Sequence, residues 1–368
     1  MRPSYGDFIL EQERKERKKR TIVILIVVLV LALIIGAVSA VLYFKKDFSF
    51  KDLFPTKDVM GTVEDTEQEI YYSQAELDSL VEKAVQSAKI EASVEALAGM
   101  KQYLAEGMSA VEAFRAVYTD EIVIAADGKY HFIPIRDDLK QNKYTTENLR
   151  VLENGEYQYV EDGQVTSYKG IDVSRFQGKI DWNAVAADGV SFAFIRVGNR
   201  GYGSGAVLQD DTFERNIKGA NAAGVKAGVY FFSQAVTEAE AVEEANFVLE
   251  QIAPYQIDCP VVCDMEMIAG DEGRADSLTP EQRTQMIKTF CDTIAAAGYT
   301  PMIYMNLELA AIRINLEELE SYDKWFAYYN PEMYFPYEYT VWQYSEKGTV
   351  AGVPEKVDMN ISFEPIWE

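Results

Sequence analysis

The second half of the chain alternates short apolar runs with helical segments, and this alternation limits the folds open to it. From Tyr168 onward the apolar runs are 170–173, 192–197, 226–232, 260–266, 301–305, 325–329, 340–344 and 357–361. Strands separated by helices form parallel sheets or barrels. We therefore predict an α/β fold for residues 168–368, a modified TIM-like parallel barrel with eight strands and about five helices. The last three strands leave little room for helices.

Helix ends between these runs carry recognisable signals. Thr237 and Glu240 have the spacing of a capping box, and Thr279 precedes Pro280 with Gln282 at the third helical position. Glycines that close a helix stand just before three of the runs, at Gly189, Gly224 and Gly298. These signals place helices between the earlier strands.

Two acidic residues, Asp264 and Glu266, end the run 260–266. Residues i and i+2 of a strand face the same side, about 6.6 Å apart, which is near the separation of paired carboxyl groups in glycoside hydrolases. Asp172 also lies at the end of its run, and chemistry in parallel barrels occurs at that end of the strands. Because exposed strand ends carry acids too, the pair alone is a weak signal.

Composition excludes several other classes of protein. A net charge of −24 argues against nucleic-acid binding. The single histidine, His131, lies outside the acid-bearing region, which argues against Ser-His-Asp or Cys-His catalysis and a histidine-rich zinc site. We expect carboxyl groups to do the chemistry, with no metal and no cofactor. The odd set Cys259, Cys263 and Cys291 forms no closed disulfide framework, so we expect small buried thiols, with a pair involving Cys291 as the alternative.

Residues 21–44 contain no charged side chain and follow a basic segment at 14–20. About 20 apolar residues span a bilayer, and basic flanks stay in the cytoplasm. We expect a cytoplasmic tail at 1–20, one transmembrane helix at 21–44 and a tether at 45–72, placing the remainder outside a cell membrane. The alternative is a signal peptide cleaved after Val38-Ser-Ala40.

Residues 73–167 read as a small helical plus β-hairpin region. A capping box at 73–76 begins a helix that we expect to end near residue 90 or 97, and residues 109–118 form another. Asp127-Gly128, Asn154-Gly155 and Asp162-Gly163 are hairpin turn signals. The helices either pack on each other or bind a protein partner.

Five segments resemble one known family. They are 169–178 (KGIDVSRFQG), 228–233 (GVYFFS), 260–266 (PVVCDME), 341–345 (VWQYS) and 357–360 (VDMN). In this order and spacing they are similar to the family 25 glycoside hydrolases, the N-acetylmuramidases called cellosyl-type lysozymes. The resemblance covers about residues 168–364, half of the chain.

The resemblance implies a barrel enzyme that cuts the β-1,4 bond between N-acetylmuramic acid and N-acetylglucosamine in the peptidoglycan glycan strand. Glu266 matches the proton donor, Asp264 the assisting acid, and Asp172 and Asp358 the other acids of the pocket. Five residues match positions that line the groove: Tyr230, Tyr304, Trp325, Tyr328 and Gln343. One departure is Phe231-Phe232, where many members have a histidine.

The sequence leaves the mechanism and part of the function open. Asp264 acts either as nucleophile or by orienting the 2-acetamido group of the substrate for attack. The function we expect is a membrane-anchored peptidoglycan hydrolase. A non-catalytic wall-binding or scaffold protein on the same barrel is the alternative, and a chitinase-like hydrolase is a weaker third.

Overall fold

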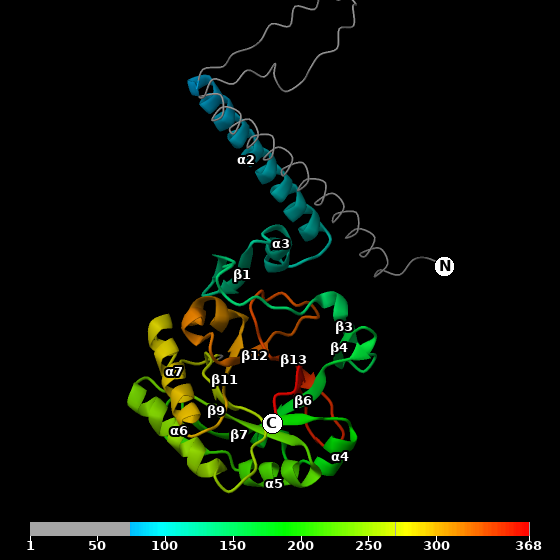
Figure 1. Ribbon diagram of the computed structural model, residues 1–368, viewed down its shortest axis with the longest axis vertical. Helices are drawn as coiled ribbons and strands as arrows, with labels where there is room; N and C mark the ends of the chain where they lie inside the picture. Colours follow the sequence, from blue (N-terminus) through cyan, green and yellow to red (C-terminus); the bar gives the residue numbers. More distant parts are fainter. Residues whose placement is uncertain (1–73, 269, 368) are drawn as a thin grey trace, which may run out of the picture. The chain divides into compact units, whose positions relative to one another are not determined.

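The computed structural model describes residues 74–268 and 270–367 (Figure 1). Residues 80–368 form one compact unit. The predicted tail at 1–20, membrane helix at 21–44 and tether at 45–72 lie outside the described residues. Among the residues that are described, no helix has both the length and the hydropathy needed to cross a membrane.

Two helices precede the first strands. α2 (Gln74–Ala105) continues past the predicted end because Gly99, although a weak helix former, leaves its hydrogen-bonded ladder intact. α3 (Ala110–Val117) begins at Ser109, whose side chain accepts from the backbone N–H of Glu112 while the Glu112 carboxylate accepts from that of Ser109. The second predicted helix is thus confirmed, and its start is fixed by a capping box.

Two small antiparallel sheets follow. β1 (Glu121–Ala126) pairs with β2 (Lys129–Pro134) across Asp127-Gly128, whose φ angles of 51° and 71° are those of a tight hairpin turn. β3 (Leu149–Val151), β4 (Tyr157–Glu161) and β5 (Gln164–Val165) form the second sheet. The predicted hairpins at Asn154-Gly155 and Asp162-Gly163 are confirmed.

Eight strands close the predicted barrel. They are β6 (Tyr168–Val173), β7 (Phe192–Arg200), β9 (Lys226–Phe232), β10 (Val261–Asp264), β11 (Pro301–Asn306), β12 (Asp323–Ala327), β13 (Val341–Gly348) and β14 (Val357–Ser362). β6 pairs with both β7 and β14, which completes the ring, while β8 (Val207–Gln209) adds to the edge of β7. The expectation of an all-parallel barrel is wrong for β14, which runs antiparallel because a short connection of residues 349–356 joins it to β13.

Alternate residues of each strand face the barrel interior. The inner layer comprises Phe192, Phe194, Tyr230, Val262, Met302, Tyr304, Trp325, Ala327 and Val341. Glycines make room for its largest rings: a Cβ at Gly170 would lie 2.2 Å from the ring of Phe192, and one at Gly228 would lie 2.7 Å from that of Phe194. The barrel is therefore a filled core at the end where its parallel strands begin. We call the other end, where the parallel strands finish, the upper end; the site lies there.

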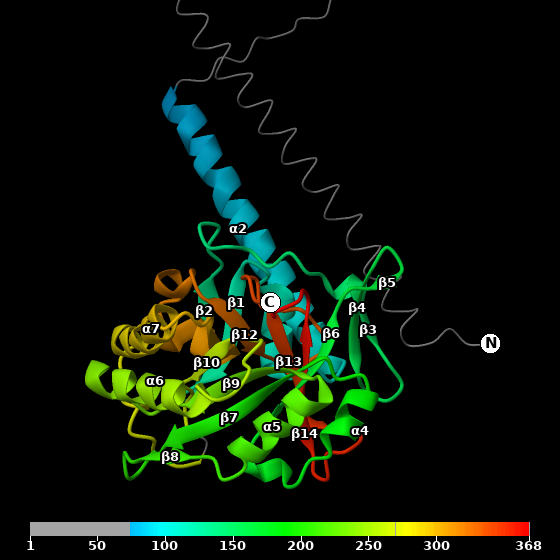
Figure 2. The same cartoon turned by 60° about the horizontal axis from the view of Figure 1, so that its bottom comes forward.

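Helices cover the outside of the barrel (Figure 2). The described α-helices of the barrel are α4 (Trp182–Ala187), α5 (Phe213–Ala223), α6 (Glu238–Ile252) and α7 (Pro280–Ala296). The predicted cap at Thr279 is confirmed as a complete capping box with Gln282. At Thr237 only half of the predicted box forms: Thr237 accepts from the N–H of Glu240, but the Glu240 carboxylate accepts from the N–H of Val236. Between β11 and β12 a π-helical turn (Leu309–Arg313) and a 3-10 turn (Leu316–Leu319) replace a fifth α-helix.

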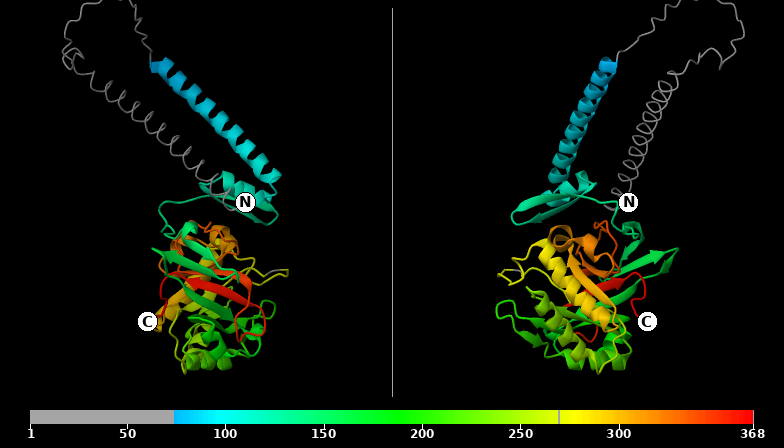
Figure 3. Two further views of the ribbon diagram at one scale, coloured as in Figure 1. Left: turned by 90° about the vertical axis from the view of Figure 1, so that its right-hand side faces the viewer. Right: turned by 60° about the vertical axis from the view of Figure 1, so that its left-hand side comes forward.

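The β3–β5 sheet lies against the side of the barrel formed by β13 (Figure 3). Tyr157 of β4 stacks on Tyr344 of β13, with ring centroids 4.2 Å apart and planes at 9°. Tyr157 also meets the edge of the Trp342 ring. This hairpin, which precedes the barrel in sequence, therefore forms part of the barrel's upper rim.

Candidate active site

Four carboxyl groups gather at the end of the barrel where the parallel strands finish. Asp172 is the penultimate residue of β6, Asp264 ends β10 and Glu266 follows two residues later. Asp358 is the second residue of β14. Because β14 is antiparallel, its first residues lie at this same end, and Asp358 is the register partner of Asp172. All four predicted acids thus share one site.

Asp172 is the hydrogen-bonding centre of this cluster. Its Oδ2 accepts from Gln343 Nε2 at 2.8 Å and from Asn360 Nδ2 at 2.9 Å, and its carboxyl group is also hydrogen-bonded to that of Asp358. Burial raises the pKa of Asp172, and these bonds to the charged form offset part of that rise. The two amides therefore favour the charged form of Asp172 and oppose the effect of burial on its pKa.

The amide of Gln343 is held from its other side by two tyrosines. Its Oε1 accepts from the hydroxyl of Tyr304 at 3.1 Å and from that of Tyr329 at 2.7 Å. These donors fix the amide orientation, so that Nε2 faces Asp172. The indole of Trp325 likewise donates to Asn360 Oδ1 at 2.8 Å, which orients the second amide.

Asp264 and Glu266 hold their protons more tightly than ordinary carboxyl groups. Burial, with the nearby charges of Glu266 and Asp172, raises the pKa of Asp264 well above its usual value. Burial, with the charge of Asp172, raises the pKa of Glu266 to about 7. Glu266 is only partly buried, whereas Asp264 is buried and its Oδ1 has no partner among the described residues. The site thus combines a proton-bearing acid open to solvent with a carboxyl oxygen free to bind a ligand.

Asp358 completes the acid set. Burial, the charge of Asp172 and the hydrogen bond between the two carboxyl groups raise the pKa of Asp358 to about 9. At neutral pH Asp358 therefore carries a proton and donates it in that bond, while Asp172 accepts. One ionised and one neutral carboxyl group can lie together in this way without two charges meeting.

The segment after β9 supports the backbone on which Glu266 lies. Gln234 Nε2 donates to the carbonyl of Glu266 at 3.4 Å, and its Oε1 accepts from the N–H of Ala275 at 3.2 Å. The backbone N–H of Ser233 donates to the carbonyl of Asp264 at 2.7 Å. These contacts tie the loop that follows β10 to the end of β9.

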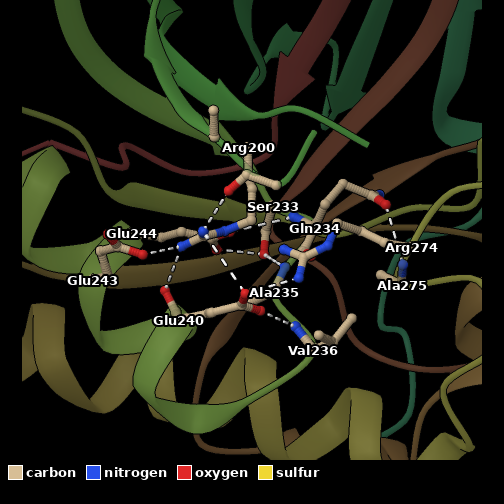
Figure 4. A network of polar contacts seen from close by, with 12 residues as sticks. Arg200, Ser233, Gln234, Ala235, Val236, Glu240, Glu243, Glu244, Arg274 and Ala275 are labelled. Atoms are coloured by element: carbon tan, nitrogen blue, oxygen red, sulfur yellow. Dashed lines mark hydrogen bonds and ion pairs between the residues drawn. The ribbon is translucent and has the colours of Figure 1, made fainter. Parts of the chain in front are cut away.

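A buried ionic network holds this segment in turn. Glu244 of α6 accepts from Ser233 Oγ at 2.6 Å and from Arg200 Nε at 2.7 Å. Arg200 also binds Glu243, and Arg274 joins Glu240 to the carbonyl of Gln234 (Figure 4). Burial raises the pKa of Glu244 to about 6, while its bonds to Ser233 and Arg200 act in the opposite direction.

The predicted groove residues fall into three places. Tyr230, Tyr304 and Gln343 face the acid cluster, as expected from alternation. Trp325 is 1% exposed and stacks on Phe194 at 4.6 Å, so it forms the floor beneath the acids and not the groove wall. The placement of Tyr328 is corrected: its hydroxyl accepts from Arg115 Nη1 at 3.0 Å, on the outer side of the barrel.

The structure adds residues that the sequence reading missed. Tyr329 takes the place expected for Tyr328, because consecutive residues of an extended segment face opposite sides. Asn360 stands two residues after Asp358, and that same-face spacing could have identified it. No local sequence pattern identifies Gln234 as a site residue, because its role depends on how α6 and the loop at Ala275 pack.

The histidine expected from the family pattern would not reach the acids from Phe231. Phe231 is fully buried in the outer layer, with its ring 5.9 Å from that of Phe247 on α6. At residue 231 the departure therefore affects helix packing, whereas Phe232 is the partly buried register partner of Asp264 at the end of β9.

Thiols and the histidine take no part in the site. Cys259, Cys263 and Cys291 are free and buried, as expected. His131 lies on β2, within 3.3 Å of the Ala126 carbonyl. No group of three or more potential metal ligands occurs within the described residues.

A barrel that brings a proton-bearing glutamate and an adjacent aspartate together at the carboxyl ends of its strands is the arrangement of a glycoside hydrolase. The profile of glycosyl hydrolases family 25 matches residues 171–353, and the chain belongs to this family. It is 30% identical to the uncharacterized protein YegX of Escherichia coli (strain K12) over 205 residues, 52% of this chain and 68% of that protein.

Other relatives share the same region. The autolytic lysozyme of Clostridium acetobutylicum is 26% identical over 199 residues, which are 54% of this chain and 56% of that enzyme, so the chain spans little more than half of its length. The modular autolysin LytC from Streptococcus pneumoniae aligns with a TM-score of 0.48 and 24% identity, over 65% of this chain and 51% of that one. The bacterial lysozyme from Streptomyces coelicolor aligns with a TM-score of 0.42 and 26% identity, over 52% and 90%.

Proposed function

We propose that this protein is a peptidoglycan hydrolase that cuts the β-1,4 bond between N-acetylmuramic acid and N-acetylglucosamine. The observation that carries the proposal is Glu266, a partly exposed acid with a pKa of about 7 beside buried Asp264. Membership of glycosyl hydrolases family 25 and similarity to an autolytic lysozyme support the substrate class.

In the proposed reaction Glu266 is the general acid. It donates its proton to the glycosidic oxygen, which leaves as the 4-hydroxyl of N-acetylglucosamine while the bond to C1 of N-acetylmuramic acid breaks. Water then adds at C1, and its proton returns to Glu266. An acid with a pKa near 7 is well matched to this cycle at neutral pH, because it both holds and releases a proton.

Asp264 is proposed to orient the 2-acetamido group of the substrate. A nucleophilic role requires an ionised carboxylate, whereas burial and two neighbouring acids keep the pKa of Asp264 high. Its unpartnered Oδ1 is available to hydrogen-bond the acetamide, whose own oxygen can then attack C1. The charge of Asp172 raises the pKa of both Asp264 and Glu266, and Asp358 is hydrogen-bonded to Asp172.

Membrane anchoring is part of the proposal and rests on the charge-free residues 21–44 with their basic flank. The net charge of −24 gives no attraction to an anionic wall. A tether would raise the local concentration of the enzyme at its substrate without any such attraction. Cell fractionation with protease protection of the intact chain would test this arrangement.

The decisive experiment is mass analysis of peptidoglycan digested by the full chain. New reducing ends on N-acetylmuramic acid are expected. Reducing N-acetylglucosamine would reassign the bond that is cut, and binding of the wall without cleavage would instead establish a non-catalytic wall-binding protein.

A further inference from the structure

A pocket of about 400 Å³ opens between the β3–β4 hairpin and the carboxyl-terminal half of β13. Its lining residues are Val151, Gly155 and Tyr157 from the hairpin region, and Tyr329, Tyr344, Ser345, Glu346 and Lys347 from the barrel. This volume lies within the range of about 300–1,000 Å³ found for small-molecule sites. The pocket is therefore large enough to hold a ligand of its own.

Two hydrogen bonds connect this pocket to the acids. Tyr329 is 50% exposed in the pocket wall, and its hydroxyl donates to Gln343 Oε1, while Gln343 Nε2 donates to Asp172. Gln343 also directly precedes the lining residues of β13 in sequence. A chain-like ligand bound at the acids can thus continue into the pocket past Tyr329.

The walls have the chemistry of a sugar-binding surface. Tyr157 and Tyr344 hold each other by stacking, and Tyr329 presents an exposed ring with a polar tip. Glu346 and Lys347 form an ion pair at 2.8 Å, so the two charges of the pocket neutralise each other. Tyr344 is only 3% exposed and is covered by Tyr157, so Tyr329 supplies the exposed aromatic face of the pocket. Such a ring beside a neutralised ion pair suits an uncharged polyhydroxylated ring better than a charged peptide stem.

We propose that this pocket is an additional subsite for an amino-sugar ring of the glycan strand, several bonds from the one that is cut. The inference deepens the proposed function and depends on it. Val151 and Tyr157 precede residue 171, where the family match begins, so this chain supplies part of the subsite from outside that match.

Two exposed valines of the same small sheet give a matched test. Val151 of β3 lines the pocket and is 50% exposed, whereas Val165 of β5 is 48% exposed and does not line it. Val151→Trp would fill the pocket, and Val165→Trp would add the same ring elsewhere. Peptide-free glycan strands of increasing length serve as substrates for the full chain. Tyr157→Ala is a second variant that removes one wall instead of blocking the space.

With long strands, Val151→Trp and Tyr157→Ala are expected to raise KM about tenfold, as for loss of one aromatic contact, and the effect should shrink as strands shorten. Val165→Trp should behave like the unsubstituted protein. Equal KM values for the Val151 and Val165 variants at every length would overturn the proposal. So would an effect seen only with peptide-bearing strands, which would assign the pocket to the stem.

Binding measured separately from cleavage distinguishes failure of the subsite from failure of the proposed function. Calorimetry with peptide-free strands, in a Glu266→Gln background, should show weaker binding after Val151→Trp and no change after Val165→Trp. Absence of cleavage by the unsubstituted protein would refute the proposed function. Equal strand affinity in the two valine variants would refute the subsite, whatever the activity.

Discussion

Asp172 and Asp358 face each other as register partners across β6 and β14, and their carboxyl groups are hydrogen-bonded. This contact exists because the last strand runs against the other seven. A parallel final strand would place residue 358 at the opposite end of the barrel. The reversal of β14 therefore supplies the fourth acid of the site.

Replacing Asp358 by asparagine is expected to preserve the bond, because an amide also donates to Asp172. Asp172→Asn should be more damaging, since it replaces one carboxylate oxygen by an N–H₂ donor and so leaves one of the three donors Gln343, Asn360 and Asp358 without an acceptor. A buried donor left without its acceptor costs about 1–3 kcal/mol. Thermal unfolding at pH 7 should show a lower Tm for Asp172→Asn than for Asp358→Asn. The reverse order would mean that Asp358 is the ionised member of the pair.

Glu266→Gln is expected to remove the general acid while leaving the fold intact. Activity on peptidoglycan should fall about 10²–10⁴-fold, the usual contribution of such a group. Glu272→Gln is the matched control, because Glu272 lies on the same loop and is exposed. Release of reducing ends measures both variants. Equal activity of the Glu266 variant and its control would exclude Glu266 from proton donation.

Much of this site could be predicted from the sequence, because Asp172, Asp264 and Glu266 stand at the ends of apolar runs that predict strands. Asp264 and Glu266 follow an apolar run, and alternation along a strand places them on one face. The antiparallel direction of β14 could not be predicted from the hydrophobic pattern alone, because buried parallel and buried antiparallel strands have similar apolar sequences. The sequence therefore assigns Asp358 only through resemblance, and the pairing of Asp358 with the predicted Asp172 comes only from the strand register.

The aromatic residues were harder to assign for a related reason. Tyr328 and Tyr329 are adjacent and identical, so choosing between them requires the exact register of the segment after β12. Trp325 faces the barrel interior, as a groove residue would, but it lies in the layer of side chains beneath the acids, stacked on Phe194. The hydrophobic alternation of a strand predicts which side chains face the barrel interior. The height of each side chain along the barrel axis depends instead on how the strands are staggered.

The pH dependence of activity should report the raised pKa of Glu266. A general acid works in its protonated form, so kcat/KM is expected to fall as pH rises through about 7. Without burial and Asp172, the same fall would begin near the ordinary value of 4.5. Initial rates on soluble glycan strands between pH 4 and pH 9 measure this limb. A loss of activity already complete at pH 6 would contradict the assignment.

Stability should change with pH in the same direction. Because the folded-state pKa of Glu266 is raised, its contribution is fully present below about pH 4.5 and is lost as pH rises through about 7. Glu266→Gln cannot ionise, so at pH 8 it should be more stable than the unsubstituted protein, by at most about 3 kcal/mol. Denaturant unfolding at pH 4 and pH 8 tests this difference, which should vanish at the lower pH.

Gln234 is expected to act as a positioning residue for the general acid. Its side chain bridges the carbonyl of Glu266 and the N–H of Ala275, and it lies fully buried. Gln234→Glu keeps the acceptor for Ala275 but loses the donor to Glu266, and it adds a buried charge beside an acid site. Displacement of Glu266 should lower kcat about tenfold to a hundredfold, and the added charge should move the alkaline limb to higher pH. Gln285→Glu, at an exposed position on α7, controls for the substitution itself. A Gln234 variant that loses stability but keeps its kcat and its alkaline limb would show that the contact serves folding only.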